Sequence, residues 1–234
     1  MAALPARPGQ PEQVTDLGTK RELAALFGRH RSARLLLGAV GAVAVLRLGL
    51  AATEIGRPGW SDLVVGAISL LLIGPVEWFA HQVLFHAPEA SRRSRLLNTG
   101  ASHRRHHADP TDLAWVLLHP RGARALMGAV TVLTLVWAVP IPLVLGDSPL
   151  GPYLTTLIIG WAAIAHYEWV HLMVHSRYRP TSRHYRRLAR NHRLHHYRNE
   201  EHWFGVTTNL GDRLLGTLPP SAESVPMSDT ARTL

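Results

Sequence analysis

The chain contains the stretch ALMGAVTVLTLVWAVPIPLVL (125–145), in which 21 consecutive residues carry no charged side chain. Twenty residues of α-helix rise about 30 Å, which matches the hydrocarbon thickness of a membrane. Three further apolar runs of similar length lie at 35–52, 63–84 and 150–174. The sequence therefore predicts an all-α integral membrane protein with four transmembrane helices.

Positive charges are distributed unevenly among the segments that connect these runs. Of the 25 Lys and Arg residues, 6 precede the first run, 7 lie in 85–124 and 10 follow residue 175. The two opposite loops hold only Arg57. Because cytosolic loops are enriched in Lys and Arg, both termini are predicted to be cytosolic. A soluble bundle of buried helices is the alternative, and the uncharged run argues against it.

The remaining segments define the expected domain organisation. Residues 1–33 are rich in Pro and Gly and then polar, which predicts a cytosolic N-terminal tail and no cleaved signal peptide. Residues 34–217 form the expected membrane domain, and residues 218–234 the expected disordered C-terminal tail. Arginine supplies 24 of the 25 cations, a bias that favours a bacterial cell membrane as the location.

Composition limits the partners and the chemistry. A net charge of +9 favours an anionic partner, but no soluble basic domain remains once the spans are assigned, so a nucleic-acid partner is not expected. The absence of Cys excludes disulfides, thiolate ligands, iron–sulfur clusters and a cysteine nucleophile. Any metal site must therefore be built from His, Asp or Glu, and the chain holds 15 histidines.

Ten of these histidines fall into four groups with regular spacing. The groups are His81 and His86 (H-x4-H), His103, His106 and His107 (H-x2-H-H), His171 and His175 (H-x3-H), and His192, His195 and His196 (H-x2-H-H). On a helix, positions i, i+3 and i+4 lie within about 100° of arc, so each H-x2-H-H group can present three imidazoles on one face as a ligand set.

The H-x4-H pair needs a different explanation. Residues five apart lie about 140° around an ideal helix, so His81 and His86 require either a helix end or two different metals. All four groups fall at predicted cytosolic span ends or in cytosolic segments, which predicts a cytosolic helical cap around one dimetal site. Ten neutral imidazoles suit two ions with about five ligands each, and Zn, Cu, Fe and Ni all remain open.

At these residues the sequence resembles the membrane fatty acid hydroxylase and sterol desaturase superfamily, and within it most closely the fatty acid 2-hydroxylase branch. The similar stretches are EWFAHQVLFH (77–86), HRRHHADPTDLAWVLLHP (103–120), HYEWVHLMVH (166–175) and HRLHHYRNEEHWFGVTTNLGDRLLGT (192–217). The resemblance implies a di-iron centre ligated by the ten histidines, with O2 as co-substrate, which inserts one oxygen atom into a C–H bond of a fatty acyl chain. Zinc could replace iron in purified samples.

Other polar residues are candidates for orienting the imidazoles by accepting their free N–H groups. The best are Glu77 and Glu168, because a carboxylate in a spanning helix is costly without a partner. Weaker candidates, or spare histidines in the same region, are Asp109, Asp112, Asp212, His166, His184 and His202.

Three readings of the function differ in what they predict. A lipid hydroxylase, with desaturation as a close variant, requires a lipid substrate and a separate electron donor such as ferredoxin, cytochrome b5 or a reductase. A carotenoid or sterol oxidase on the same scaffold would alter pigments or sterols instead. A membrane metal carrier or sensor would place its ligands along a path in mid-span, whereas these histidines gather at one face.

Overall fold

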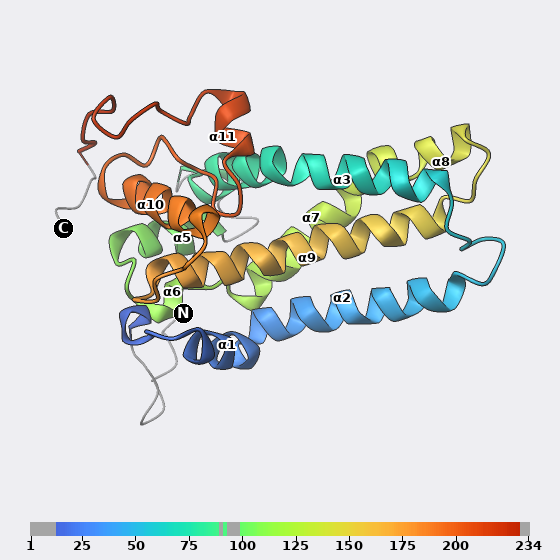
Figure 1. Cartoon of the computed structure of the whole chain (residues 1–234), viewed down its shortest axis with the longest axis horizontal. Coiled ribbons are helices and arrows are strands. Elements are labelled where there is room, and N and C mark those ends of the chain that lie inside the picture. Colours follow the sequence, from blue (N-terminus) through green and yellow to red (C-terminus); the bar gives the residue numbers. More distant parts are fainter. Residues whose placement is uncertain (1–12, 89–90, 93–98, 230–234) are drawn as a thin grey trace. The chain divides into compact units, whose positions relative to one another are not determined.

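A computed structural model describes residues 13–88, 91–92 and 99–229. Figure 1 shows these residues as helices and connecting loops, and no strand occurs among them. In chain order the elements are η1 (Val14–Asp16), α1 (Lys20–Arg29), α2 (Arg31–Leu50), α3 (Trp60–Phe79), η2 (Ala80–Phe85), α5 (Thr99–Ala108), α6 (Leu113–Val116), α7 (Pro120–Ala138), α8 (Pro140–Val144), α9 (Leu150–His175), α10 (Arg183–Tyr197) and α11 (Leu210–Leu215).

Four helical segments are long and apolar enough to cross a membrane, as the sequence predicts. They are Arg31–Leu50, Trp60–Phe85, Leu113–Val144 and Leu150–His175. Each contains most of the corresponding predicted run; the ends differ by a few residues, except that the third segment begins 12 residues before its run. The third run is not one straight helix, because α7 ends at Ala138 and α8 begins with Pro140. Proline has no backbone N–H to donate to the preceding turn, so the helix is interrupted there.

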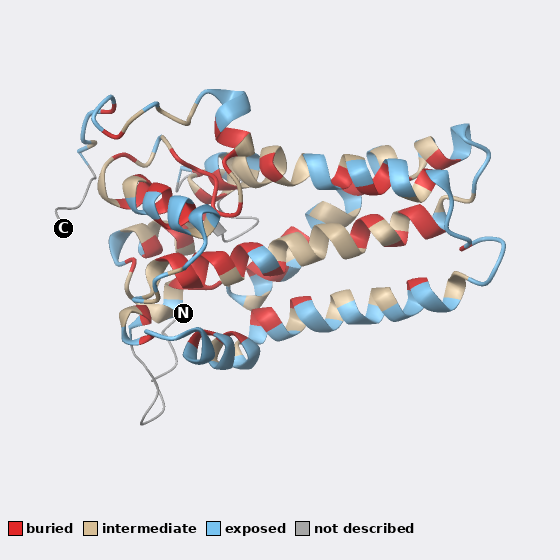
Figure 2. Cartoon of the chain, in the orientation of Figure 1, coloured by how far each residue is buried: buried red, intermediate tan, exposed pale blue. Residues whose placement is uncertain are grey.

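The described residues divide into two compact units. Unit 2 comprises 31–73 and 120–166, and therefore α2, α7, α8, most of α3 and the first part of α9. Many of its large apolar side chains are exposed, including Leu48 (74%) and Val144 (85%), whereas Ser69 and Thr156 are buried. Figure 2 shows exposed residues along these helices. This inverted distribution is typical of helices that face lipid.

Unit 2 is held together by close helix packing and one ion pair. Leu36, Met127 and Ala165 form a core between α2, α7 and α9. At Gly160 an added Cβ would lie only 2.5 Å from Val130, so the absence of a side chain allows α9 and α7 to approach closely. The ion pair joins Arg47 of α2 to Asp62 of α3, with Nη2 and Oδ1 2.9 Å apart.

Unit 1 comprises 1–30, 74–119 and 167–234 and contains all four histidine groups. Its N-terminal part includes a helix where the sequence predicts only a tail. Thr19 and Glu22 form a capping box at the start of α1, and Phe27 packs edge-on against Trp169 with ring centroids 5.6 Å apart. The T-x-x-E spacing is the sequence signal for this helix. Residues 1–12 of the predicted tail lie outside the described residues.

The C-terminal segment also differs from its prediction as a disordered tail. Residues 218–229 lie against the end of α10. The Nε–H of Arg198 donates to the carbonyl oxygen of Val225 at 2.7 Å, and the backbone N–H of Ser228 donates to the carbonyl oxygen of Arg198 at 2.9 Å. Val225 is buried. These hydrogen bonds hold residues 218–229 in place, although the segment shows no hydrophobic periodicity that would predict a helix or a strand. Residues 230–234 lie outside the described residues.

Candidate metal centre

The H-x4-H pair lies on a π-helical turn. In η2 the backbone N–H of His86 donates to the carbonyl of His81, five residues earlier, at 3.1 Å. A turn closed by an i→i+5 bond brings residues five apart to the same face, which an α-helical turn would not do. The spacing left two explanations open, a helix end or two different metals. The structure supports the first, because the π-helical turn lies at the end of the helical segment and both rings belong to one cluster.

The two H-x2-H-H motifs do not each form one ligand set. In α5, His103 and His107 point toward His81 and His86, whereas His106 points toward His171 and His175. In α10 the division is reversed, because His195 faces the first group and His192 and His196 face the second. The i, i+4 pair of each motif shares one helix face, and the middle histidine lies beside it.

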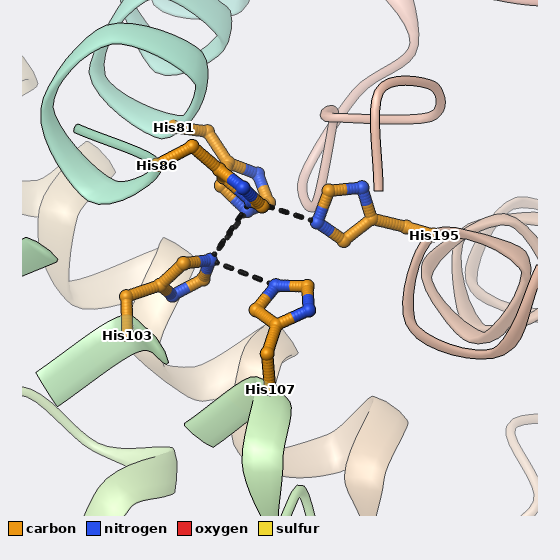
Figure 3. Close-up of side chains that lie close together, drawn as sticks. All are labelled: His81, His86, His103, His107 and His195. Carbon is orange, nitrogen blue, oxygen red and sulfur yellow. Dashed lines mark hydrogen bonds between the residues drawn. The ribbon is translucent and has the colours of Figure 1, made fainter. Parts of the chain in front are cut away.

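The ten histidines therefore form two clusters of five. Cluster 1 contains His81, His86, His103, His107 and His195, and Figure 3 shows their rings turned toward a common centre. Cluster 2 contains His106, His171, His175, His192 and His196. Within each cluster the potential ligand atoms all lie within 4.8 Å of one another. The two clusters are adjacent, since the rings of His107 and His196 stack with centroids 4.1 Å apart.

The distances between ring nitrogens fit metal coordination. In cluster 1 the contacts His81–His103, His103–His107 and His86–His195 join Nε2 atoms at 3.1 to 3.2 Å. In cluster 2 the Nε2 atom of His175 lies 2.9 Å from that of His192. Two nitrogens bound to one ion at about 2.1 Å and at right angles lie about 3.0 Å apart. The Nε2 atom of His171 is buried and has no hydrogen-bond partner, which leaves its lone pair available.

Backbone carbonyls hold three of the rings in the orientation that a ligand needs. The Nδ1 atom of His81 lies 2.5 Å from the carbonyl oxygen of Phe204, that of His171 lies 2.7 Å from Val116 O, and that of His195 lies 2.8 Å from His202 O. A carbonyl can only accept, so Nδ1 carries the hydrogen and Nε2 presents a lone pair to the cluster. No sequence pattern indicates these three acceptors.

Two of the proposed orienting carboxylates act on the backbone near these carbonyls and not on the rings. Asp212 accepts from the N–H groups of Phe204 and Gly205, each at 2.8 Å, and from the hydroxyl of Thr217 at 2.6 Å. Glu77 accepts from the backbone N–H groups of Val206 and Thr207 and from the Thr207 hydroxyl. Both carboxylates thus fix the 204–207 segment that supplies the acceptor for His81.

Glu168 lies beside a small cavity that reaches both clusters. Its carboxylate accepts from Leu118 N at 2.7 Å. The cavity has a volume of about 20 Å³, which is room for one water-sized molecule. His103 of cluster 1 and His171 of cluster 2 both line it, and its walls include Phe85 and Tyr167.

The other candidates belong to neither cluster. Asp109 accepts from Thr111 within a turn, and Asp112 caps α6 by accepting from Ala114 N. His184 is exposed on α10, and His166 is exposed in unit 2. His202 contributes through its backbone, because its carbonyl is the acceptor for His195.

Burial keeps the imidazoles neutral. It lowers the pKa of His86 to about 4, although Glu200 acts in the opposite direction. The pKa values of five further cluster histidines lie well below their usual range, chiefly because burial disfavours the cation and then because neighbouring imidazoles repel it. These are His103, His106, His192, His195 and His196. Burial also raises the pKa of Asp212, against its hydrogen bonds from Thr217, Gly205 and Phe204. Neutral imidazole is the form that binds metal.

The fold and these clusters together define an all-helical membrane protein with a histidine-rich site that could hold metal ions. Residues 66–217 match the family model described as fatty acid hydroxylase, and the chain belongs to that family. The family is one of oxidoreductases known for their use of iron. Searches among curated proteins and among solved structures found no match.

Proposed function

We propose that this protein is an O2-dependent hydroxylase that inserts one oxygen atom into a C–H bond of a fatty acyl chain, at the 2-position. The observation that carries the proposal is the pair of five-histidine clusters with their Nε2 atoms turned inward. Acid and base side chains cannot cleave an unactivated C–H bond, so a redox metal must supply the oxidant. Two iron ions, one in each cluster, would supply O2 activation when bound.

The reaction balances with an external reductant. One atom of O2 enters the C–H bond as a hydroxyl group, and the other leaves as water with two protons and two electrons. The electrons come from a separate donor protein, such as a ferredoxin, cytochrome b5 or a reductase. The protein's part is to hold the imidazoles neutral and oriented and to exclude bulk water from the clusters.

The substrate and location follow the same reasoning. An acyl chain can approach from the bilayer between lipid-facing helices, with its headgroup at the interface. Phe85 and Tyr167 line the small cavity that reaches His103 and His171, and we propose that an acyl chain reaches the clusters by widening this cavity along their aromatic rings. Both termini are proposed to face the cytosol of a bacterial cell, because the Lys and Arg residues concentrate on that side.

Lipid mass spectrometry tests the proposal directly. Cells that express the wild type with a reductase system should contain acyl chains heavier by one oxygen atom, with fragmentation that places the hydroxyl at the 2-position. Cells with His195→Ala, which removes one Nε2 from cluster 1, should not. An iron-loaded wild type that leaves acyl chains unchanged but oxidises carotenoids or sterols would move the substrate to that class. Unchanged lipids of every class would refute hydroxylation.

A further inference from the structure

Helix α10 has two faces of opposite character, as the alternation of buried and exposed residues in Figure 2 shows. The buried face carries His192, His195 and His196, which enter both clusters. The exposed face carries five arginines: Arg183, Arg186, Arg187, Arg190 and Arg193. Their spacing confines them to about 120° of arc, opposite the histidines. We call these five residues the arginine face.

The arginine face is a concentrated positive surface. Helix α10 contains no Asp or Glu. Glu223 interacts electrostatically with Arg198 and Arg190, so some charge is compensated near the C-terminal end of the helix. Arg183 and Arg187, in the first two turns, lie at the other end. A surface of one sign steers an oppositely charged partner and raises its rate of association.

The position of this surface relative to the clusters suits electron delivery. A helix with its side chains is about 10 to 12 Å across, so a partner on the arginine face lies one helix diameter from the imidazoles on the other. Electron tunnelling falls steeply with distance, and α10 offers a short route to both clusters, because His195 belongs to cluster 1 and His192 to cluster 2.

The side chains of α10 favour a protein partner over a lipid surface. A helix that lies in a membrane interface combines its cations with exposed large apolar anchors. No large apolar side chain of α10 is exposed, and Leu188 is buried within the protein. The arginine face thus has charge without anchors, as expected for a surface that meets an acidic protein in water.

We propose that the arginine face of α10 is the docking surface for an acidic one-electron donor protein. The proposal rests on the proposed function, which needs two electrons for each hydroxylation and thus two encounters with such a donor. Binding is governed by charge, is reversible and weakens as salt screens the arginines.

The test measures binding, without turnover. An acidic plant-type [2Fe–2S] ferredoxin is titrated, at low salt, against the full-length protein in phosphatidylcholine nanodiscs. Arg183→Glu/Arg187→Glu should raise the Kd by about tenfold or more and flatten its salt dependence. Glutamate at 183 lies in the first turn, where a negative charge is favourable, and glutamate is a good helix former at 187, so α10 should still form in this variant. The control is Arg21→Glu/Arg29→Glu on α1, which changes net charge equally at exposed positions and should leave the Kd within twofold.

The possible outcomes separate docking from chemistry. Equal Kd values for the two double variants, with thermal stability unchanged, would overturn the docking surface. So would an α10 variant that keeps its Kd for ferredoxin but loses association with phosphatidylglycerol, because the face would then belong to lipid headgroups. Charge-dependent docking without hydroxylation of any lipid would leave the surface standing and refute the proposed function. Full hydroxylation by the α10 variant at low donor concentration would support the proposed function and overturn the docking surface.

Discussion

At the scale of single residues, backbone carbonyls decide how the cluster rings are oriented. His81, His171 and His195 each direct Nδ1 to a carbonyl oxygen, which leaves Nε2 as the free donor atom. Carbonyls can do this only if their own segments are fixed. For His81 that support comes from Asp212, which accepts from the two consecutive backbone N–H groups at 204 and 205.

Asp212→Ala should therefore lower metal affinity without removing a ligand. The change leaves two buried backbone N–H groups without acceptors, at a cost of about 1 to 3 kcal/mol each, and releases the segment that holds His81. Loss of such an outer partner typically weakens metal binding about 10- to 100-fold. Iron content after dialysis against graded concentrations of a competing chelator measures the effect.

Asp109→Ala is the matched control for this change, because Asp109 is an exposed carboxylate that accepts from the backbone N–H and the hydroxyl of Thr111 and belongs to neither cluster. Its iron content should equal that of the wild type. If Asp212→Ala retained iron as tightly as this control, the support that Asp212 gives to the Phe204 carbonyl would have no bearing on the metal.

Sequence periodicity was sufficient to find the ten cluster histidines but not their partition. Spacings of three and four show which residues share a helix face, and all ten do converge. The cluster that each ring joins depends on how α5 and α10 pack against each other. This tertiary contact stacks His107 on His196, which lies 89 residues away in the sequence. The carbonyl acceptors are hidden for the same reason, since Phe204 lies 123 residues from His81.

At the scale of elements, two glycines allow the end of α3 to cross α11 at very short distance. A Cβ added at Gly211 would lie 2.5 Å from Trp78 Cβ and 2.6 Å from the carbonyl oxygen of Gly74. A Cβ at Gly74 would likewise lie 2.9 Å from Leu210 Cβ. This crossing fixes α11, and with it Asp212, next to the helix that leads to His81.

Gly211→Ala should destabilise the protein by about 1 to 3 kcal/mol, because the backbone of Gly74 cannot move aside as a flexible side chain could. Gly128→Ala is the control, since an added Cβ there meets nothing within 4 Å. Thermal unfolding in detergent should show a lower Tm for Gly211→Ala alone. Equal Tm values would mean that α3 and α11 separate at little cost and that the crossing does not position Asp212.

At the scale of the whole chain, a charged pair joins the helices of unit 2. Arg47 donates to Asp62 Oδ1 (2.9 Å), to the Gly56 carbonyl (2.6 Å) and to Thr155 Oγ1 (3.1 Å), and Thr155 donates to Asp62. The side chains of Arg47 and Asp62 are each only 10% exposed. Arg47 lies inside the first apolar run (35–52), but the sequence pattern does not identify its partner, because the contacts bring together three helices, α2, α3 and α9, and the loop that contains Gly56.

Arg47→Leu should cost about 3 to 5 kcal/mol, because it leaves Asp62 as a nearly buried charge without a counterion. The double variant Arg47→Leu/Asp62→Leu removes both charges and should recover part of that loss. The exposed Arg57 is the control, and Arg57→Leu should change the free energy of unfolding by less than about 0.5 kcal/mol. Unfolding by denaturant in detergent gives these values. A double variant less stable than Arg47→Leu alone would contradict the ion-pair account.

Metal removal should affect the whole molecule, because the clusters are joined from four separate parts of the chain. Cluster 1 draws on η2, α5 and α10, and cluster 2 adds α9. An ion that binds only the folded state stabilises it in proportion to the logarithm of its free concentration over Kd, by about 4 kcal/mol at a thousandfold excess. A chelator should therefore lower the Tm of iron-loaded protein, and readdition of iron should restore it.

Two substitutions on α10 make this test specific. His196→Ala removes a cluster 2 ring, so this variant should bind less iron and lose less Tm to the chelator than the wild type. His184→Ala removes an exposed ring from the same helix and should respond as the wild type does. The cap residues of α10, Ser182 and Arg198, are unchanged in each variant. An equal response of the two variants would mean that the stabilising ion is bound outside the clusters.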